Sequence, residues 1–100
     1  MAILVDRPIW PFDRRLWSHL VSDSSFDELH EFASRLGVPR KAFQGDHYDI
    51  PAELFDQAIR LGAKLVDPRD LVGSLKRAGL RLPPKLRRGT GQGEVSRPED

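Results

Sequence analysis

The stretch AIRLGAKLVDP, residues 58–68, joins the end of one predicted helix to the start of the next through a short extended segment. Gly62 follows an apolar helical stripe and is the residue type that most often ends helices. The apolar run after Gly62 has the length of a buried strand. Asp67 and Pro68 are the residue types preferred at a helix N-cap and in a first helical turn. This helix–strand–helix order predicts an α/β domain.

The same pattern of arginine, apolar residue, glycine and apolar residue ends two other predicted helices, in SRLGV (34–38) and KRAGLRL (76–82). The first of these helices begins at a capping box formed by Ser25 and Glu28. Four apolar runs alternate with the helices and predict strands. They are AILVD (2–6), LWSHLVSD (16–23), HYDI (47–50) and AKLVD (63–67). We therefore predict a small single α/β domain of about four short strands and three helices, with a partly parallel sheet and an unresolved strand order.

Composition limits the function classes. The chain has 100 residues, 39% of them hydrophobic and 31% charged, which fits one small globular domain. It has no cysteine, which excludes disulfides and cysteine-based metal sites or nucleophiles. A net charge of +1 gives no strong attraction to nucleic acid or membranes. The N-terminal residues do not resemble a signal peptide and no segment is long enough to span a membrane, so we expect a cytoplasmic protein. A core of this size is also compatible with a homo-oligomer.

The composition changes after Leu82. Residues 83–100 are rich in proline, glycine and charge and nearly lack apolar side chains. We therefore predict a folded domain over residues 1–82 and a disordered tail over 83–100. The basic start of the tail would suit an acidic partner, although such runs are more often only solvated.

Each predicted strand has an aspartate at its last or second-to-last position. These residues are Asp6, Asp23, Asp49 and Asp67. Ligands of α/β sheets bind outside the carboxyl ends of strands, and carboxylates gathered there suit Mg²⁺ or Mn²⁺. Asp67 is explained more simply as a helix N-cap, and Asp23 as a complement to the dipole of the helix that follows. Asp6 and Asp49 have no such simple explanation, and together with Asp23 they form the predicted metal set.

Two histidines strengthen this hypothesis. His19 shares strand parity with Asp23, and His47 shares it with Asp49, so each pair faces one side of its strand. If the two strands are neighbours, these four side chains could bind Zn²⁺ or Mn²⁺, or act in metal-free acid–base catalysis. The alternative is that His19 and His47 are hydrogen-bonded residues at the edge of a small core. His30 lies off the apolar stripe of its helix and is predicted to face solvent.

The segment RPIWPFDRR, residues 7–15, contains two prolines and is predicted to be an irregular loop. Arg14 and Arg15 could pair with phosphate groups, and Trp10 could stack on a nucleobase. Tyr48 lies within the His47–Asp49 triplet and is a further candidate ligand-binding residue. The alternative for the aromatic residues is that they fill the open side of the core.

Several segments resemble the domain-of-unknown-function 4031 family of small bacterial and phage proteins. The similar segments are ILVD, LWSHLVSD, ELHEFASRLGV, FQGDHYDI and AIRLGA, and together they extend from about residue 2 to residue 80. The resemblance implies one compact domain in a bacterial, cytoplasmic setting. The family has no assigned activity, so the resemblance implies no catalytic residue, but its most specific motifs are centred on His19 and His47.

Two functional hypotheses follow. In the first, His19 and His47 act as catalytic residues beside carboxylates that hold a divalent metal. Arg14 or Arg15 then stabilises a nucleotide or other phosphate-containing ligand during hydrolysis or transfer. In the second, the chain is a non-catalytic module that binds protein or nucleic acid, with an aromatic surface patch and no convergence of polar groups. The chain lacks the Walker, GxGxxG, HExxH and GxSxG motifs, so the sequence supports none of those enzyme classes.

Overall fold

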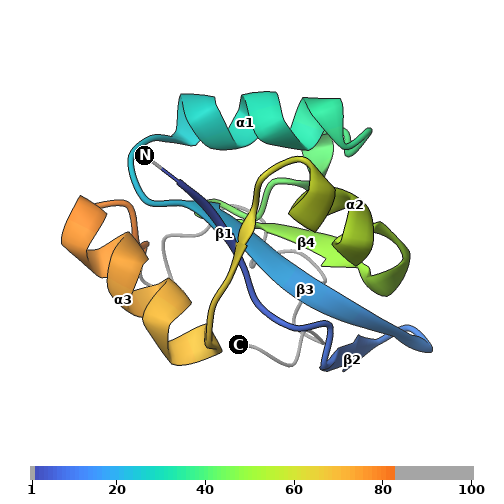
Figure 1. Ribbon diagram of the computed structural model, residues 1–100. Helices are drawn as coiled ribbons and strands as arrows, with labels where there is room; N and C mark the ends of the chain where they lie inside the picture. The colour runs from blue at the N-terminus through green and yellow to red at the C-terminus, as the bar shows by residue number, and fades with distance from the viewer. Residues whose placement is uncertain (1, 83–100) are drawn as a thin grey trace.

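The computed structural model describes residues 2–82, which form a mixed five-stranded sheet and three α-helices (Figure 1). The predicted tail, residues 83–100, lies outside the described residues. The elements are β1 (Ile3–Val5), β2 (Trp10–Phe12), β3 (Arg15–Ser22), α1 (Phe26–Arg35), η1 (Arg40–Ala42), β4 (Tyr48–Pro51), η2 (Ala52–Leu54), α2 (Phe55–Arg60), β5 (Lys64–Leu65) and α3 (Pro68–Ala78).

The long strand β3 organises the sheet. It pairs antiparallel with β1, β2 and β4, and β5 joins β1 in parallel. Leu20 has partners in both β1 and β4, while Trp17 has partners in both β2 and β4. Because a strand has only two edges, β1 and β2 must follow one another along one edge of β3, and β4 occupies the other. The predicted small α/β domain with a partly parallel sheet is confirmed.

The prediction of a loop over residues 7–15 is wrong, because this segment contains β2. A two-residue turn joins β2 to β3, with positive φ angles of 55° at Asp13 and 65° at Arg14. Such angles are typical of the type I′ turns that match the twist of a hairpin. Pro11 is tolerated because β2 pairs with β3 alone among the described strands, so the missing amide proton costs no ladder hydrogen bond.

Two helix boundaries follow the predicted signals. The Ser25 hydroxyl caps α1 by accepting a hydrogen bond from the Glu28 amide at 3.1 Å. Gly79 ends α3 in the left-handed conformation, with φ of 75°. Asp67 is the N-cap residue of α3, but its side chain makes no capping hydrogen bond.

Helices cover both faces of the sheet. On one face, Val5, Leu20 and Ile50 belong to a hydrophobic cluster that includes residues of α1 and α2. On the other face, Leu4 and Val21 pack against Leu71 and Leu75 of α3. Since side chains alternate along β3, residues 17 and 19 share the α3 face with Val21. The candidate site lies on this second face, beside the part that α3 covers.

Candidate functional site

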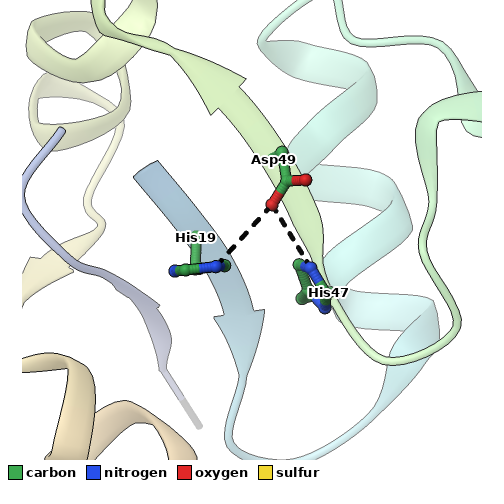
Figure 2. A group of neighbouring side chains, drawn as sticks. All are labelled: His19, His47 and Asp49. Atoms are coloured by element: carbon green, nitrogen blue, oxygen red, sulfur yellow. Dashed lines mark ion pairs between the residues drawn. The ribbon is translucent and has the colours of Figure 1, made fainter. Parts of the chain in front are cut away.

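Three predicted residues, His19, His47 and Asp49, converge on the α3 face of the sheet (Figure 2), and we call them the His/Asp cluster. Asp49 lies directly opposite His19 in the β3–β4 ladder, and His47 precedes β4 with the same parity as Asp49. Asp49 Oδ1 is 3.2 Å from His47 Nε2 and 4.0 Å from His19 Nε2. The two imidazole rings are 5.2 Å apart between centroids. The cluster therefore brings two ring nitrogens and one carboxylate oxygen to a single point.

Asp6 orients the imidazole of His19 from behind. Its carboxylate is fully buried, and Oδ2 lies 2.8 Å from His19 Nδ1. This contact engages Nδ1 and leaves Nε2 as the ring nitrogen that faces Asp49. Asp6 was predicted to be a metal ligand, but it contacts the opposite ring nitrogen and lies outside the cluster.

The same carboxylate completes the sheet where β1 ends. Asp6 Oδ1 accepts a hydrogen bond from the His19 backbone amide at 2.6 Å, in the position of a missing main-chain carbonyl. The Asp6 amide donates to the His19 carbonyl at 3.2 Å. Trp10 Nε1 also donates to Asp6 Oδ2, at 3.0 Å. The buried Asp6 carboxylate thus holds the β3 backbone, the Trp10 indole and the His19 imidazole in position.

Asp46 orients His47 in the same way. Asp46 is fully buried, and its Oδ1 lies 2.7 Å from His47 Nδ1, so His47 also turns Nε2 toward Asp49. Asp46 Oδ2 accepts a hydrogen bond from the Leu82 amide at 3.0 Å and lies 3.7 Å from Arg81 Nη1. Sequence reasoning missed this role, although an acid immediately before a candidate histidine was an available signal.

The cluster has the donor set of a metal site with open coordination positions. Its three ligand atoms lie within 4.8 Å of one another. Ligands at the usual distance of about 2.0–2.1 Å from Zn²⁺ are roughly 3.4 Å apart in a tetrahedral arrangement. Side-chain rotations that move the ligand atoms by about 1 Å would bring them to this tetrahedral spacing. The side chains of His19, His47 and Asp49 are only 12%, 5% and 9% exposed, so an ion held there would be largely shielded from water.

Asp23 shares parity with His19 but does not join the cluster. It follows the end of β3, where its Oδ1 accepts a hydrogen bond from the Ala2 amide at 2.7 Å. The structure thus gives Asp23 a contact with the start of the chain rather than with His19. Strand parity alone was misleading, because four residues of strand span about 13 Å.

Arg14 and Arg15 also lie away from the cluster. Arg14 is exposed in the hairpin turn, and Arg15 is exposed at the first position of β3. The Arg15 guanidinium lies over the ring of Trp17, 5.9 Å from its centroid. Both arginines therefore lie at the hairpin end of β3, at least four residues before His19 along the chain.

Tyr48 points to the opposite face of the sheet, which corrects its placement with the candidate ligand-binding residues of this site. It is fully buried, and its hydroxyl lies 2.8 Å from His30 Nδ1. Burial raises the pKa of Tyr48, while burial and the nearby Arg40 cation lower the pKa of His30. Both directions favour a neutral pair in which the Tyr48 hydroxyl donates to Nδ1.

His30 is therefore not the solvent-facing residue that was predicted. It is half-buried, and its ring packs edge-on against Phe43, 4.7 Å between centroids. A cleft of about 390 Å³ opens beside the His30–Tyr48 pair, lined also by Ser34, Gly37, Val38, Pro39 and Arg40. This cleft lies across the sheet from the His/Asp cluster.

We expect Tyr48→Phe to separate the two faces experimentally. The change removes one hydrogen bond and should lower the free energy of unfolding by about 0.5–1.5 kcal/mol. Metal affinity should stay within about twofold of wild type, because the ring still fills the core and the hydroxyl faces away from the cluster. Urea denaturation and metal titration of the same preparation would check both expectations. A large loss of metal binding would contradict the assignment of Tyr48 to the other face.

Comparison with known proteins gives one match. The model of a family described as "Protein of unknown function (DUF4031)" matches residues 3–78. No curated protein and no solved structure matches the chain. None of the helices within residues 2–82 has the length and apolar character needed to cross a membrane.

Proposed function

The chain belongs to the DUF4031 family, and because that family is described only as of unknown function, we propose a function from the site itself. The His/Asp cluster binds one divalent transition-metal ion. The protein uses it to hydrolyse a phosphate-containing substrate.

The observation that carries this proposal is the orientation of both imidazoles by buried carboxylates. Histidines that bind metals almost always donate their second ring N–H to a carboxylate, carbonyl or water, which fixes the tautomer and raises ligand basicity. Here His19 is held by Asp6 and His47 by Asp46, each through Nδ1 and each at less than 3 Å. Both Nε2 atoms are thereby pre-oriented toward the Asp49 carboxylate.

The ligand types favour Zn²⁺ or Mn²⁺ over Mg²⁺. Imidazole suits transition metals, whereas Mg²⁺ prefers oxygen ligands and keeps several waters. Three protein ligands are the number found in catalytic zinc sites, where the fourth position takes water or substrate. A metal in this position would lower the pKa of a bound water and polarise a phosphoryl oxygen.

The reaction balances with water as the only co-reactant. The water oxygen forms a new bond to phosphorus, the ester P–O bond breaks, and the leaving oxygen gains a proton. Asp6 and Asp46 keep the two imidazoles in position during this exchange. Arg81, 30% exposed and next to Asp46, supplies a positive charge close to the His47 side of the cluster, which supports an anionic substrate.

The alternative hypothesis, a non-catalytic interaction module, predicted that the polar residues do not converge. The convergence of three ligand atoms at the cluster favours the metal hypothesis over this alternative. A metal-free acid–base site uses the same residues and is distinguished by the titration below.

The test is a titration of metal-free protein with Zn²⁺, Mn²⁺ and Mg²⁺, followed by calorimetry and thermal denaturation. We expect one ion per chain, with affinity in the order Zn²⁺, Mn²⁺, Mg²⁺. Metal at 100 times its dissociation constant should stabilise the fold by about 2.7 kcal/mol. A wild-type protein that binds no metal, or binds Mg²⁺ as tightly as Zn²⁺, would reject the proposal.

The metal-loaded protein should then hydrolyse chromogenic phosphate monoesters or diesters. The background control is His47→Ala assayed at the same metal concentration. Rates equal to that background across the panel would reject the hydrolytic function while leaving the metal site in place.

A further inference from the structure

A row of side chains extends from the His/Asp cluster along the β2–β3 hairpin. The indole of Trp10 packs edge-on against His19, 5.1 Å between ring centroids. Trp10 pairs directly across the ladder with Trp17, and the Arg15 guanidinium lies over the Trp17 ring. Since residues 15, 17 and 19 alternate along one face of β3, the row and the cluster share that face. We call Trp10, Trp17 and Arg15 the aromatic stripe.

The two indoles are held in place at their polar edges. Trp10 Nε1 donates to Asp6 Oδ2 at 3.0 Å, and Trp17 Nε1 donates to the Phe12 carbonyl at 2.9 Å. Both tryptophans are half-buried, so each keeps part of its surface accessible. Neither belongs to the two hydrophobic clusters of the core, so the expectation that these aromatics fill the core does not account for them. They form a fixed aromatic surface next to the cluster.

The geometry points to a ligand that combines nucleobases with phosphate, and we infer that the stripe binds single-stranded nucleic acid. Bases stack on indoles with little sequence preference, and arginine adds a phosphate contact or a cation–π interaction. The four residue steps from Arg15 to His19 span about 13 Å, and stacked nucleotides rise about 3.4 Å each, so the stripe together with His19 is long enough for three or four nucleotides. The placement of a phosphate at the metal rests on the proposed function. The stacking of bases on the stripe does not depend on it.

The charge distribution limits the expected affinity. The net charge of +1 gives little long-range attraction to a polyanion. Arg15 is the cation of the stripe, so binding should depend only weakly on salt. Each neutralised phosphate of a single strand contributes a slope of about −0.7 in the logarithm of affinity against that of salt concentration. A slope near this value would distinguish the stripe from a general basic patch.

Tryptophan fluorescence gives a direct test, because the chain has only two tryptophans and both belong to the stripe. The probes are an eight-nucleotide oligothymidylate, the mononucleotide TMP, and ribose 5-phosphate, which lacks a base. We expect the oligonucleotide to quench the fluorescence with or without Zn²⁺, TMP to bind more weakly, and ribose 5-phosphate to have no effect. Equal binding of TMP and the oligonucleotide would replace the nucleic-acid assignment with a mononucleotide.

Variants sharpen the test. Trp17→Ala should weaken oligonucleotide binding by about 5- to 150-fold, read from the fluorescence of Trp10. Leu16→Ala is the matched control, since Leu16 is 48% exposed on the opposite face of β3 and should leave affinity unchanged. Arg15→Ala retains both indoles and should reduce the salt slope by about 0.7. Thermal denaturation of each variant verifies folding.

The outcomes separate the two proposals. Oligonucleotide quenching without Zn²⁺ binding would support the stripe while rejecting the metal site. Zn²⁺ binding without quenching by any nucleotide would overturn the stripe and leave the metal site standing.

Discussion

Replacing Asp49 with asparagine, or His47 with alanine, is expected to weaken Zn²⁺ binding by about 100-fold or more. Loss of a residue that merely orients a ligand typically costs 10- to 100-fold in metal affinity, and removing a ligand itself should cost at least the upper end of that range. Asp49→Asn removes the negative charge that offsets the cation, and His47→Ala removes one of the two Nε2 donors. Calorimetric titration with Zn²⁺ would measure both losses.

Asp23→Asn is the matched control for the metal titration. Asp23 is another carboxylate of the predicted metal set, but its Oδ1 accepts a hydrogen bond from the Ala2 amide, and asparagine has an oxygen that can accept the same bond. Its Zn²⁺ affinity should match wild type. If Asp49→Asn also bound Zn²⁺ like wild type, the Asp49 carboxylate would not be a ligand and the proposed three-ligand site would be rejected.

Asp6→Ala is expected to lower the free energy of unfolding by about 3–5 kcal/mol. The side chain is fully buried and accepts hydrogen bonds from Trp10 Nε1, the His19 amide and His19 Nδ1. Each donor left without a partner costs about 1–3 kcal/mol when it stays buried, and local relaxation reduces the sum. For a domain of this size, the midpoint of thermal unfolding should fall by roughly 15–30 °C.

Asp67→Ala is the control for stability. Asp67 is exposed and its side chain makes no capping hydrogen bond, so its loss should change the midpoint by only a few degrees. Thermal and urea denaturation would compare the two variants with wild type. An Asp6→Ala midpoint as close to wild type as that of Asp67→Ala would show that the three hydrogen bonds contribute little to folding.

The order of helices and strands was predictable because local signals mark it. Gly79 and the Ser25 cap delimit helices through backbone conformation and side-chain hydrogen bonds that act within a few residues. Strand β2 was not predictable in the same way, since Pro11 weakens its pattern and its turn uses Asp13 and Arg14 at positive φ without any glycine. Here pairing with β3 overrides the local preferences.

The candidate site was predictable only in part. Alternation placed His47 and Asp49 on one face of their strand, but their distance from His19 depends on the register between β3 and β4, which no local pattern encodes. The orienting roles of Asp6 and Asp46 depend on which ring nitrogen each carboxylate meets. Tyr48 sits between two cluster residues in the sequence yet contacts His30 across the sheet, because neighbouring side chains of a strand point in opposite directions.

The double role of Asp6 has an evolutionary consequence. A carboxylate that both replaces a main-chain acceptor in the sheet and holds His19 is subject to selection for folding before selection for activity. Asp49 and His47 instead meet each other within the cluster, 3.2 Å apart between Oδ1 and Nε2. In a lineage that abandons the chemistry, Asp49 or His47 should therefore be lost first, while Asp6 persists as a relic of the site within an inactive descendant.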